Sequence, residues 1–279
     1  MPTVPPAQSP PAQAPAESHQ AREVAESFGA EASRYDRARP SYPAALVERI
    51  VAASPGRSVL DVGCGTGIVA RLFQAAGCEV LGVDPDGRMA GHARERGLEV
   101  EVATFETWET NGRGFDTVVS GQAWHWVDPV AGAAKAAAAL RPGGRFAVFW
   151  NVFQPPAELG QAFAETYRRV LPDLPSGRWD RPLLGIYETM GAKAADGMRQ
   201  TGAFGPPEQW YFEWERPYTR DEWLEQVPTF GGFSRIPPDQ GQAILAGIGA
   251  AIDAAGGGFT MGFTTLAVTA ALAVAAGPG

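Results

Sequence analysis

Short apolar runs alternate with longer amphipathic stretches over the first half of the chain. The apolar runs are rich in Val and Leu and are bounded by Gly, Pro or Asp, which is typical of buried strands. They lie at 58–62, 79–83, 98–103, 115–120 and 145–150. Helical patterns lie between them, at 68–76, 87–96 and about 130–140. This alternation predicts an α/β fold with a parallel sheet and right-handed crossovers.

The pattern changes after Trp150. Helical patterns then dominate, with one strand of alternating aromatic residues at 209–215 and a final strand at 263–268. The helices are expected at 157–171, 186–199, 219–227 and 238–255. The third begins with Thr219-Arg220-Asp221-Glu222, which has the sequence of a capping box. We therefore expect a helical cap inserted late in the chain.

Charge and composition narrow the class of protein. The net charge is −8 at pH 7 and the pI is about 5.0, which argues against nucleic acid as a partner because such proteins carry a basic face. Cys64 and Cys78 are the only cysteines, so a reducing, cytoplasmic setting is expected. No apolar run reaches the roughly 18 residues of a membrane span, and the first residues lack the features of a signal peptide. We expect a cytoplasmic monomer or homodimer without a membrane or metal site.

The most informative stretch is 58–67, where an apolar strand breaks into glycines at alternate positions and a helix follows directly. Strand, glycine turn and helix form the context in which a nucleotide-like ligand meets a helix N-terminus. Glycine permits the sharp turn and close approach of the backbone to the ligand. The G-x-G-x-x-G spacing of dinucleotide sites is broken, because Ile68 stands at the third position.

The acidic residue within this strand narrows the ligand further. The carboxylate of Asp61 would repel a pyrophosphate and attract an ammonium or a sulfonium. S-adenosylmethionine carries both cations. Asp84 ends the second strand about 20 residues later, where a carboxylate can accept the ribose hydroxyls. The ends of the third and fourth strands, at 102–106 and 120–122, are expected to face the same ligand crevice. The first segment is expected to bind the adenine, and the second to border the site.

These motifs resemble the class I S-adenosylmethionine-dependent methyltransferases over roughly residues 45–150. Leu60-Asp61-Val62-Gly63-Cys64-Gly65-Thr66-Gly67, Gly82-Val83-Asp84 and Leu140-Arg141-Pro142-Gly143-Gly144 match three motifs of that family. Tyr35, Arg39-Pro40-Ser41-Tyr42-Pro43 and Ala123-Trp124-His125-Trp126 are similar to the type 11, trans-aconitate methyltransferase-like subgroup. The resemblance implies a Rossmann-like, seven-stranded, mostly parallel sheet with helices on both faces, and S-adenosyl-L-methionine as the cofactor.

The chain divides into four expected parts. Residues 1–20 are rich in Pro, Ala, Gln and Ser and are expected to form a disordered tail. Residues 21–154 should form the cofactor-binding core with an N-terminal lid. Residues 155–258 should form the helical cap that binds the substrate and contributes the strand near 209–215. Residues 259–279 should supply the final core strand and a tail.

The resemblance also implies roles for single residues. Asp61 would hold the ammonium directly or through water, Asp84 the ribose, and Arg39 the methionine carboxylate. Thr104 stands where the family usually has Asp, and its hydroxyl accepts more weakly from the adenine amine. The residues expected to bind the cofactor are Tyr35, Arg39, Asp61, Gly63, Cys64, Gly65, Asp84, Pro85, Met89, Thr104, Phe105 and Gln122.

His125 follows the fourth strand and is the candidate catalytic base, with an ordinary pKa suited to that role. The alternative is a packed histidine that shapes the pocket wall. Trp124 and Trp126 are the candidate substrate-binding residues, by stacking or by cation–π contact; the alternative is packing between core and cap. Aromatic residues of the cap favour an apolar small molecule as substrate.

Three functions stay open at this point. The first is methyl transfer to a small molecule, with a carboxylate, hydroxyl, amine or carbon acceptor. The second is an NAD(P)-dependent oxidoreductase, against which Asp61 and the glycine spacing argue. The third is a regulator that binds the cofactor without turnover.

Overall fold

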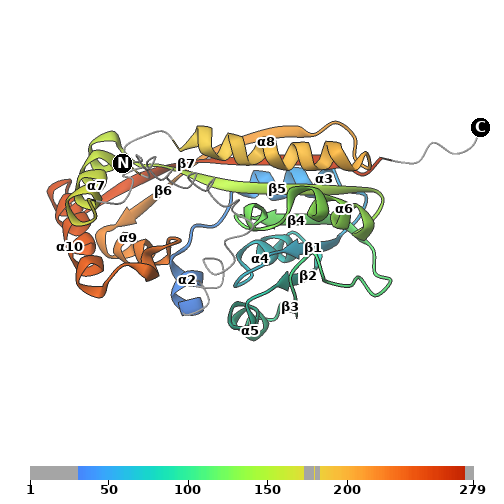
Figure 1. Cartoon of the computed structure of the whole chain (residues 1–279), viewed down its shortest axis with the longest axis horizontal. Helices are drawn as coiled ribbons and strands as arrows, with labels where there is room; N and C mark the ends of the chain where they lie inside the picture. Colours follow the sequence, from blue (N-terminus) through green and yellow to red (C-terminus); the bar gives the residue numbers. More distant parts are fainter. Residues whose placement is uncertain (1–30, 173–178, 180–182, 274–279) are drawn as a thin grey trace, which may run out of the picture.

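The computed structural model describes residues 31–172, 179 and 183–273. Its centre is a seven-stranded sheet in the order β3-β2-β1-β4-β5-β7-β6 (Figure 1). Neighbours from β3 to β5 pair in parallel, and β7 pairs antiparallel with both β5 and β6. The prediction of a mostly parallel α/β sheet is confirmed. The predicted disordered tail lies outside the described residues.

The strands occur along the chain near their predicted positions, but the last three are longer than predicted. The β5–β7 ladder continues to the pair Gln154–Gly262, and the β6–β7 ladder continues to the pair Thr219–Gly258. These extensions carry the sheet beyond the other strands and support the cap. The strands are β1 Ser58–Val62, β2 Glu79–Asp84, β3 Glu99–Val102, β4 Phe115–Gly121, β5 Leu140–Gln154, β6 Glu208–Thr219 and β7 Gly258–Ala271.

The helices lie close to their predicted positions. The predicted capping box is present, since the Thr219 side chain accepts from the Glu222 amide and Glu222 accepts from the Thr219 amide. Pro43 is the N-cap of α3. The α-helices are α2 Ala32–Ala38, α3 Ala44–Ala52, α4 Ile68–Ala75, α5 Gly87–Glu95, α6 Pro129–Ala139, α7 Ala157–Val170, α8 Leu184–Thr201, α9 Arg220–Gln226 and α10 Pro238–Ala254.

Helices cover both faces of the sheet. On one face, apolar residues of α3, α4 and α5 form a cluster with the sheet. On the other face, alanines of α6 and α8 pack on the sheet with Phe146 and Trp150 of β5. Small residues allow the close approach of these two helices, since a Cβ on Gly197 would lie 2.1 Å from the carbonyl oxygen of Pro129.

The predicted cap at 155–258 needs a correction, because α8 belongs to the core. The cap consists of α7, α9, α10 and the short turns at 227–235, and it packs around Phe163, Trp223 and Ile248 on the extended ends of β5, β6 and β7 (Figure 1). A helical pattern does not tell which surface the helix covers, so sequence reasoning grouped all these helices. Within the described ranges, none of the helices combines the length and apolar character needed to cross a membrane.

Candidate functional site

The glycine loop between β1 and α4 has a backbone that only glycine adopts easily. Gly63, Gly65 and Gly67 have φ angles of 67°, 54° and 86°. A Cβ on Gly63 would lie 2.4 Å from the Cβ of Ala123, whereas a Cβ on Gly65 would meet no atom within 4 Å. Gly63 therefore packs tightly against the segment after β4, and Gly65 borders open space.

Asp84, at the end of β2, fixes the shape of this loop. Its Oδ2 accepts from the Gly65 amide at 2.8 Å, and its Oδ1 accepts from the Asp86 amide at 2.9 Å. Burial raises the pKa of Asp84 to about 6, although these two amide bonds oppose the rise. Each carboxylate oxygen has a second lone pair, so the predicted role of Asp84 in ribose binding remains chemically open.

Asp61 lies below the loop and is fully buried. Neither carboxylate oxygen has a hydrogen-bond partner among the described residues. Burial, followed by the nearby charge of Asp84, raises the pKa of Asp61 to about 8; the Ala70 amide at the start of α4 lowers it only in part and lies outside full hydrogen-bond geometry. A buried carboxylate without a partner is unfavourable, and a cationic ligand beside the loop would compensate it. The residues therefore fit a ligand that carries an ammonium group.

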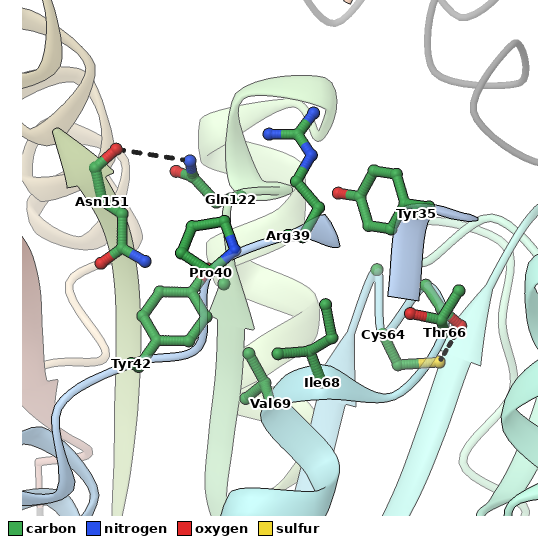
Figure 2. A pocket seen from close by; sticks show the side chains of 13 residues that line it. Tyr35, Arg39, Pro40, Tyr42, Cys64, Thr66, Ile68, Val69, Gln122 and Asn151 are labelled. Carbon is green, nitrogen blue, oxygen red and sulfur yellow. Dashed lines mark hydrogen bonds between the residues drawn. The ribbon is translucent and has the colours of Figure 1, made fainter. Parts of the chain in front are cut away.

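A cleft of about 490 Å³, including its open mouth, lies above the loop. Residues 32–42, which we call the strap, roof the cleft with Tyr35, Arg39, Pro40 and Tyr42. Figure 2 shows the glycine-loop side on one flank, at Cys64 and Thr66, and Gln122 with Asn151 on the opposite flank. The structure thus brings Tyr35, Arg39, Gly63, Cys64, Gly65 and Gln122 of the predicted set to one cleft.

Arg39 joins the strap to the cap. Its Nη2 donates to the carbonyl oxygen of Thr229, and its guanidinium carbon lies 4.8 Å from the ring centre of Tyr35 and 5.1 Å from that of Phe230. Its Nε is buried and has no partner among the described residues. The predicted pairing of Arg39 with the methionine carboxylate stays a prediction, and Arg39 also has a contact with the cap that the sequence did not indicate.

Asp36 anchors the other side of the strap to the core. Its side chain is only 4% exposed, and it forms ion pairs with Arg71 of α4 at 2.6 Å and with Arg96 at 3.3 Å. Burial raises the pKa of Asp36, but hydrogen bonds and the charge of Arg71 outweigh this effect, so the net pKa is lowered. The sequence did not indicate the role of Asp36, because its partners Arg71 and Arg96 lie far from it along the chain.

Asn151 was also missed, although its position carried a signal. It is the one amide within the apolar run Phe149–Phe153 of β5 and is nearly fully buried. Its Nδ2 donates to the carbonyl oxygen of Ser41 at 2.9 Å, and its Oδ1 accepts from Thr265 at 2.6 Å. Asn151 therefore holds the strap against the sheet beside the cleft.

The residues predicted to contact the adenine and its surroundings lie outside the residues that line the cleft. Met89 and Phe105 are buried, at 5% and 4% exposure. The Thr104 hydroxyl lies 2.8 Å from that of Thr107. The roles assigned to Pro85, Met89, Thr104 and Phe105 stay predictions.

His125 lies in the short η3 helix Trp124–Trp126, and its role as a base stays a prediction. The indole Nε1 of Trp150 donates to Nδ1 of His125 at 3.3 Å. Because an indole nitrogen only donates, Nδ1 holds the lone pair and the hydrogen resides on Nε2. Burial lowers the pKa of His125 to about 4. His125 is thus a poor proton acceptor, and the alternative of a packed histidine describes it better.

Trp124 is a core residue rather than a substrate-binding one. It is 2% exposed and packs edge-on against Phe146 and Phe105, at ring-centre distances of 4.8 and 6.2 Å. Trp126 is partly exposed, and its ring centre lies 4.5 Å from that of His125. The substrate-binding role of Trp126 stays a prediction.

Residues 35–169 match the family of methyltransferase domains. This stretch, just under half of the chain, carries a methyltransferase domain. A Mycobacterium tuberculosis protein named as an uncharacterised methyltransferase is 38% identical over 133 residues, which are 47% of this chain and 54% of that protein. A Saccharomyces cerevisiae protein provisionally named an S-adenosylmethionine-dependent methyltransferase is 32% identical over 136 residues, 45% of this chain and 46% of its own length. The matched part of the methyltransferase domain thus spans about half the length of these relatives.

A solved structure from Anaeromyxobacter dehalogenans supports the fold. It is provisionally assigned as a type II methyltransferase. The two chains are 24% identical, and their superposition has a TM-score of 0.58 and covers 83% of this chain and 97% of that chain. The name of the Saccharomyces cerevisiae relative gives S-adenosylmethionine as its cofactor. The glycine loop, the open space at Gly65 and the unpartnered Asp61 fit this cofactor. The similarity to the trans-aconitate methyltransferase-like subgroup stays a prediction.

Proposed function

We propose that this chain transfers the methyl group of S-adenosylmethionine to a small molecule. The observation that carries the proposal is Asp61, a fully buried carboxylate without a partner among the described residues, beneath a glycine loop that borders the cleft. An ammonium bound beside Asp61 favours its ionised form and gains a countercharge, whereas a pyrophosphate would raise the pKa of Asp61 further and offers no such partner. The same observation disfavours an NAD(P)-dependent oxidoreductase.

The residues of the cleft would each hold one part of the cofactor. Gly63, Cys64 and Gly65 would border its methionine portion, Asp61 its ammonium and Asp84 its ribose. Tyr35 and Arg39 would close over it, with Arg39 Nε available to the methionine carboxylate. When bound, the cofactor supplies an already activated methyl group, so the chain mainly contributes proximity and alignment.

The position of the cap supports a small molecule as the acceptor. Arg39 contacts both the cleft and Phe230 of the cap, so the two regions adjoin. The acidic net charge disfavours nucleic acid. Two buried free cysteines support a reducing, cytoplasmic setting.

Calorimetry with S-adenosylhomocysteine, S-adenosylmethionine and NAD(P)H tests the cofactor, and formation of S-adenosylhomocysteine with a panel of acids, phenols and amines tests turnover. We expect binding of the first two ligands and turnover with part of the panel. Binding of NAD(P)H alone would refute the proposal. Cofactor binding without any turnover would favour the regulator.

A matched pair of glycine variants checks that the loop is the site. Gly63→Ala places a methyl group 2.4 Å from Ala123 and requires a positive φ, so it should abolish cofactor binding. Gly91→Ala, in α5, meets no atom within 4 Å and should bind like the wild type. Equal affinity of both variants would contradict the assignment of the loop.

A further inference from the structure

Gln122 has an unusual backbone conformation at the edge of the cleft. It follows β4, and its φ of 57° is in the left-handed region that few residues other than glycine adopt. Its amide donates to the carbonyl oxygen of Phe149 at 2.9 Å, which ties this conformation to β5. Residues held in such conformations concentrate at functional sites, because the surrounding structure must enforce them.

The orientation of the Gln122 side chain is set by Asn151. Its Nε2 donates to the main-chain oxygen of Asn151 at 3.5 Å (Figure 2). If the side-chain amide of Gln122 were turned by 180°, Oε1 would face the main-chain oxygen of Asn151, and two acceptors would lie against each other. Oε1 is therefore the atom left on the other side, where it is buried and has no partner among the described residues. Buried side-chain acceptors normally have a donor, and this one belongs to a side chain that lines the cleft.

A chain of hydrogen bonds holds Asn151 in place. Its Oδ1 accepts from the Thr265 hydroxyl at 2.6 Å, and that hydroxyl accepts from the Trp214 indole at 2.9 Å. Its Nδ2 donates to Ser41 of the strap at 2.9 Å. These bonds connect three strands with the roof of the cleft at the residue whose main-chain oxygen contacts Gln122.

This side of the cleft leads toward the cap. Two residues beyond Asn151, β5 reaches Phe153, whose ring lies 5.6 Å from that of Phe230 and 6.2 Å from that of Trp223 in the cap. The carboxylates Asp61 and Asp84 lie instead at β1 and β2, where the glycine loop begins. The Gln122 acceptor is therefore placed where a molecule bound under the cap would approach the cofactor.

We propose that Gln122 determines acceptor specificity: its Oε1 accepts a hydrogen from a neutral amine or hydroxyl group of the substrate, and Asn151 positions it. This proposal rests on the proposed function. A carboxylate acceptor has no hydrogen to donate and would place its charge against the Gln122 oxygen.

Electrons and protons balance both for an amine acceptor and for a hydroxyl acceptor. The lone pair of the acceptor nitrogen or oxygen forms the new bond to the methyl carbon, and the electrons of the sulfur–carbon bond remain on sulfur. The surplus proton of the methylated ammonium or oxonium leaves to water. The hydrogen bond to Gln122 directs the acceptor lone pair toward the methyl group.

The test uses benzylamine, phenol and benzoate as probes with the full-length protein. Transfer is measured as S-adenosylhomocysteine formed, and cofactor binding as the affinity for added S-adenosylhomocysteine. We expect methylation of benzylamine or phenol. Gln122→Leu should lower kcat/KM for that probe by about tenfold or more, with the affinity for S-adenosylhomocysteine changed less than about threefold. Gln200→Leu, at an exposed position of α8, is the control and should change neither value.

A second variant guards against misfolding. Gln122→Asn keeps a residue that tolerates a positive φ but withdraws the acceptor from the cleft, so the same loss of kcat/KM is expected.

Thr265→Val should lower kcat through loss of the Asn151 hydrogen bond, and Thr265→Ser should restore it. Methylation of benzoate alone, methylation of none of the probes, or a more than tenfold loss of S-adenosylhomocysteine affinity in Gln122→Asn would overturn the proposal. Failure of the wild type to bind S-adenosylhomocysteine would instead refute the proposed function.

Discussion

Replacement of Asp61 by asparagine changes the number of protons exchanged when the cofactor binds. With a pKa of about 8, Asp61 is protonated in about nine-tenths of the unliganded molecules at pH 7. An ammonium beside the carboxylate favours its ionised form. Binding at pH 7 should therefore release most of one proton, and the isosteric but non-titrating amide that D61N introduces cannot release it.

The ligand's own amine sets the opposite trend at high pH. The free α-carboxylate of this ligand keeps the pKa of its amine above the value of about 7.7–8.0 for a chain terminus, so the amine is mostly an ammonium at pH 7 and pH 8. The release from Asp61 is therefore about 0.9 proton at pH 7 and falls to about half a proton at pH 8, and uptake by the amine dominates only at higher pH. Affinity should rise between pH 7 and pH 8. Asp84, with a pKa of about 6, adds at most about a tenth of a proton at pH 7.

Calorimetry of S-adenosylhomocysteine in phosphate and in Tris buffer measures this exchange, because the observed heat includes that of buffer ionisation. D61N should show almost no release at pH 7, the same uptake at pH 9, and an affinity weaker by about 1.5–3 kcal/mol. Asp116→Asn is the control: Asp116 is another buried strand aspartate, paired with Arg141 away from the cleft. No proton release by the wild type at pH 7, or a release that persists in D61N, would refute the reasoning.

The unliganded protein offers an independent check on the same group. Because burial raises the folded pKa of Asp61 above that of the unfolded chain, the folded state binds the proton more tightly. Stability from this group is present at low pH and decreases as the pH rises from about 4 to about 8. D61N should therefore raise Tm at pH 9 and remove part of the decline between pH 5 and pH 9.

Three further predictions follow from single contacts. Asp84→Ala should weaken S-adenosylhomocysteine binding by about 1–3 kcal/mol, since charged hydrogen bonds are lost; an unchanged Kd in calorimetry argues against a ribose contact. Asp36→Ala removes the buried ion pair with Arg71 and should lower Tm by about 5 °C in a thermal melt, and an unchanged Tm would show that the strap is not anchored there. His125→Ala loses the Trp150 hydrogen bond and should cost about 1 kcal/mol of stability without a large change in kcat; a hundredfold fall in kcat would reinstate His125 as a base.

The parallel half of the sheet was predictable because its signals are local. β1, β2 and β4 are short apolar runs, and the helices α4, α5 and α6 that follow them have their own periodicity and end signals. The extensions of β5, β6 and β7 were missed because they depend on pairing between segments far apart in the chain, such as Gln154 with Gly262. The placement of α8 depends on the small residues that let it reach α6 and the sheet.

The candidate site also has a part that could be predicted from local sequence motifs and a part that depends on long-range contacts. The glycine loop, Asp61 and Asp84 are contiguous motifs, and their chemistry could be predicted from residue type and spacing. Asn151 bonds to Ser41 and Thr265, which lie more than 100 residues away in either direction, so only the fold shows its role. The environment of His125 could not be predicted either, because its pKa and its hydrogen position depend on Trp150 and on burial.

A crystal structure of the complex with S-adenosylhomocysteine tests the central claim most directly. The account predicts the methionine portion along Gly63–Gly65, the ammonium within direct or single-water reach of Asp61, and the ribose hydroxyls at Asp84. A ligand whose ammonium lies away from Asp61, with that carboxylate still unpartnered, would contradict the account.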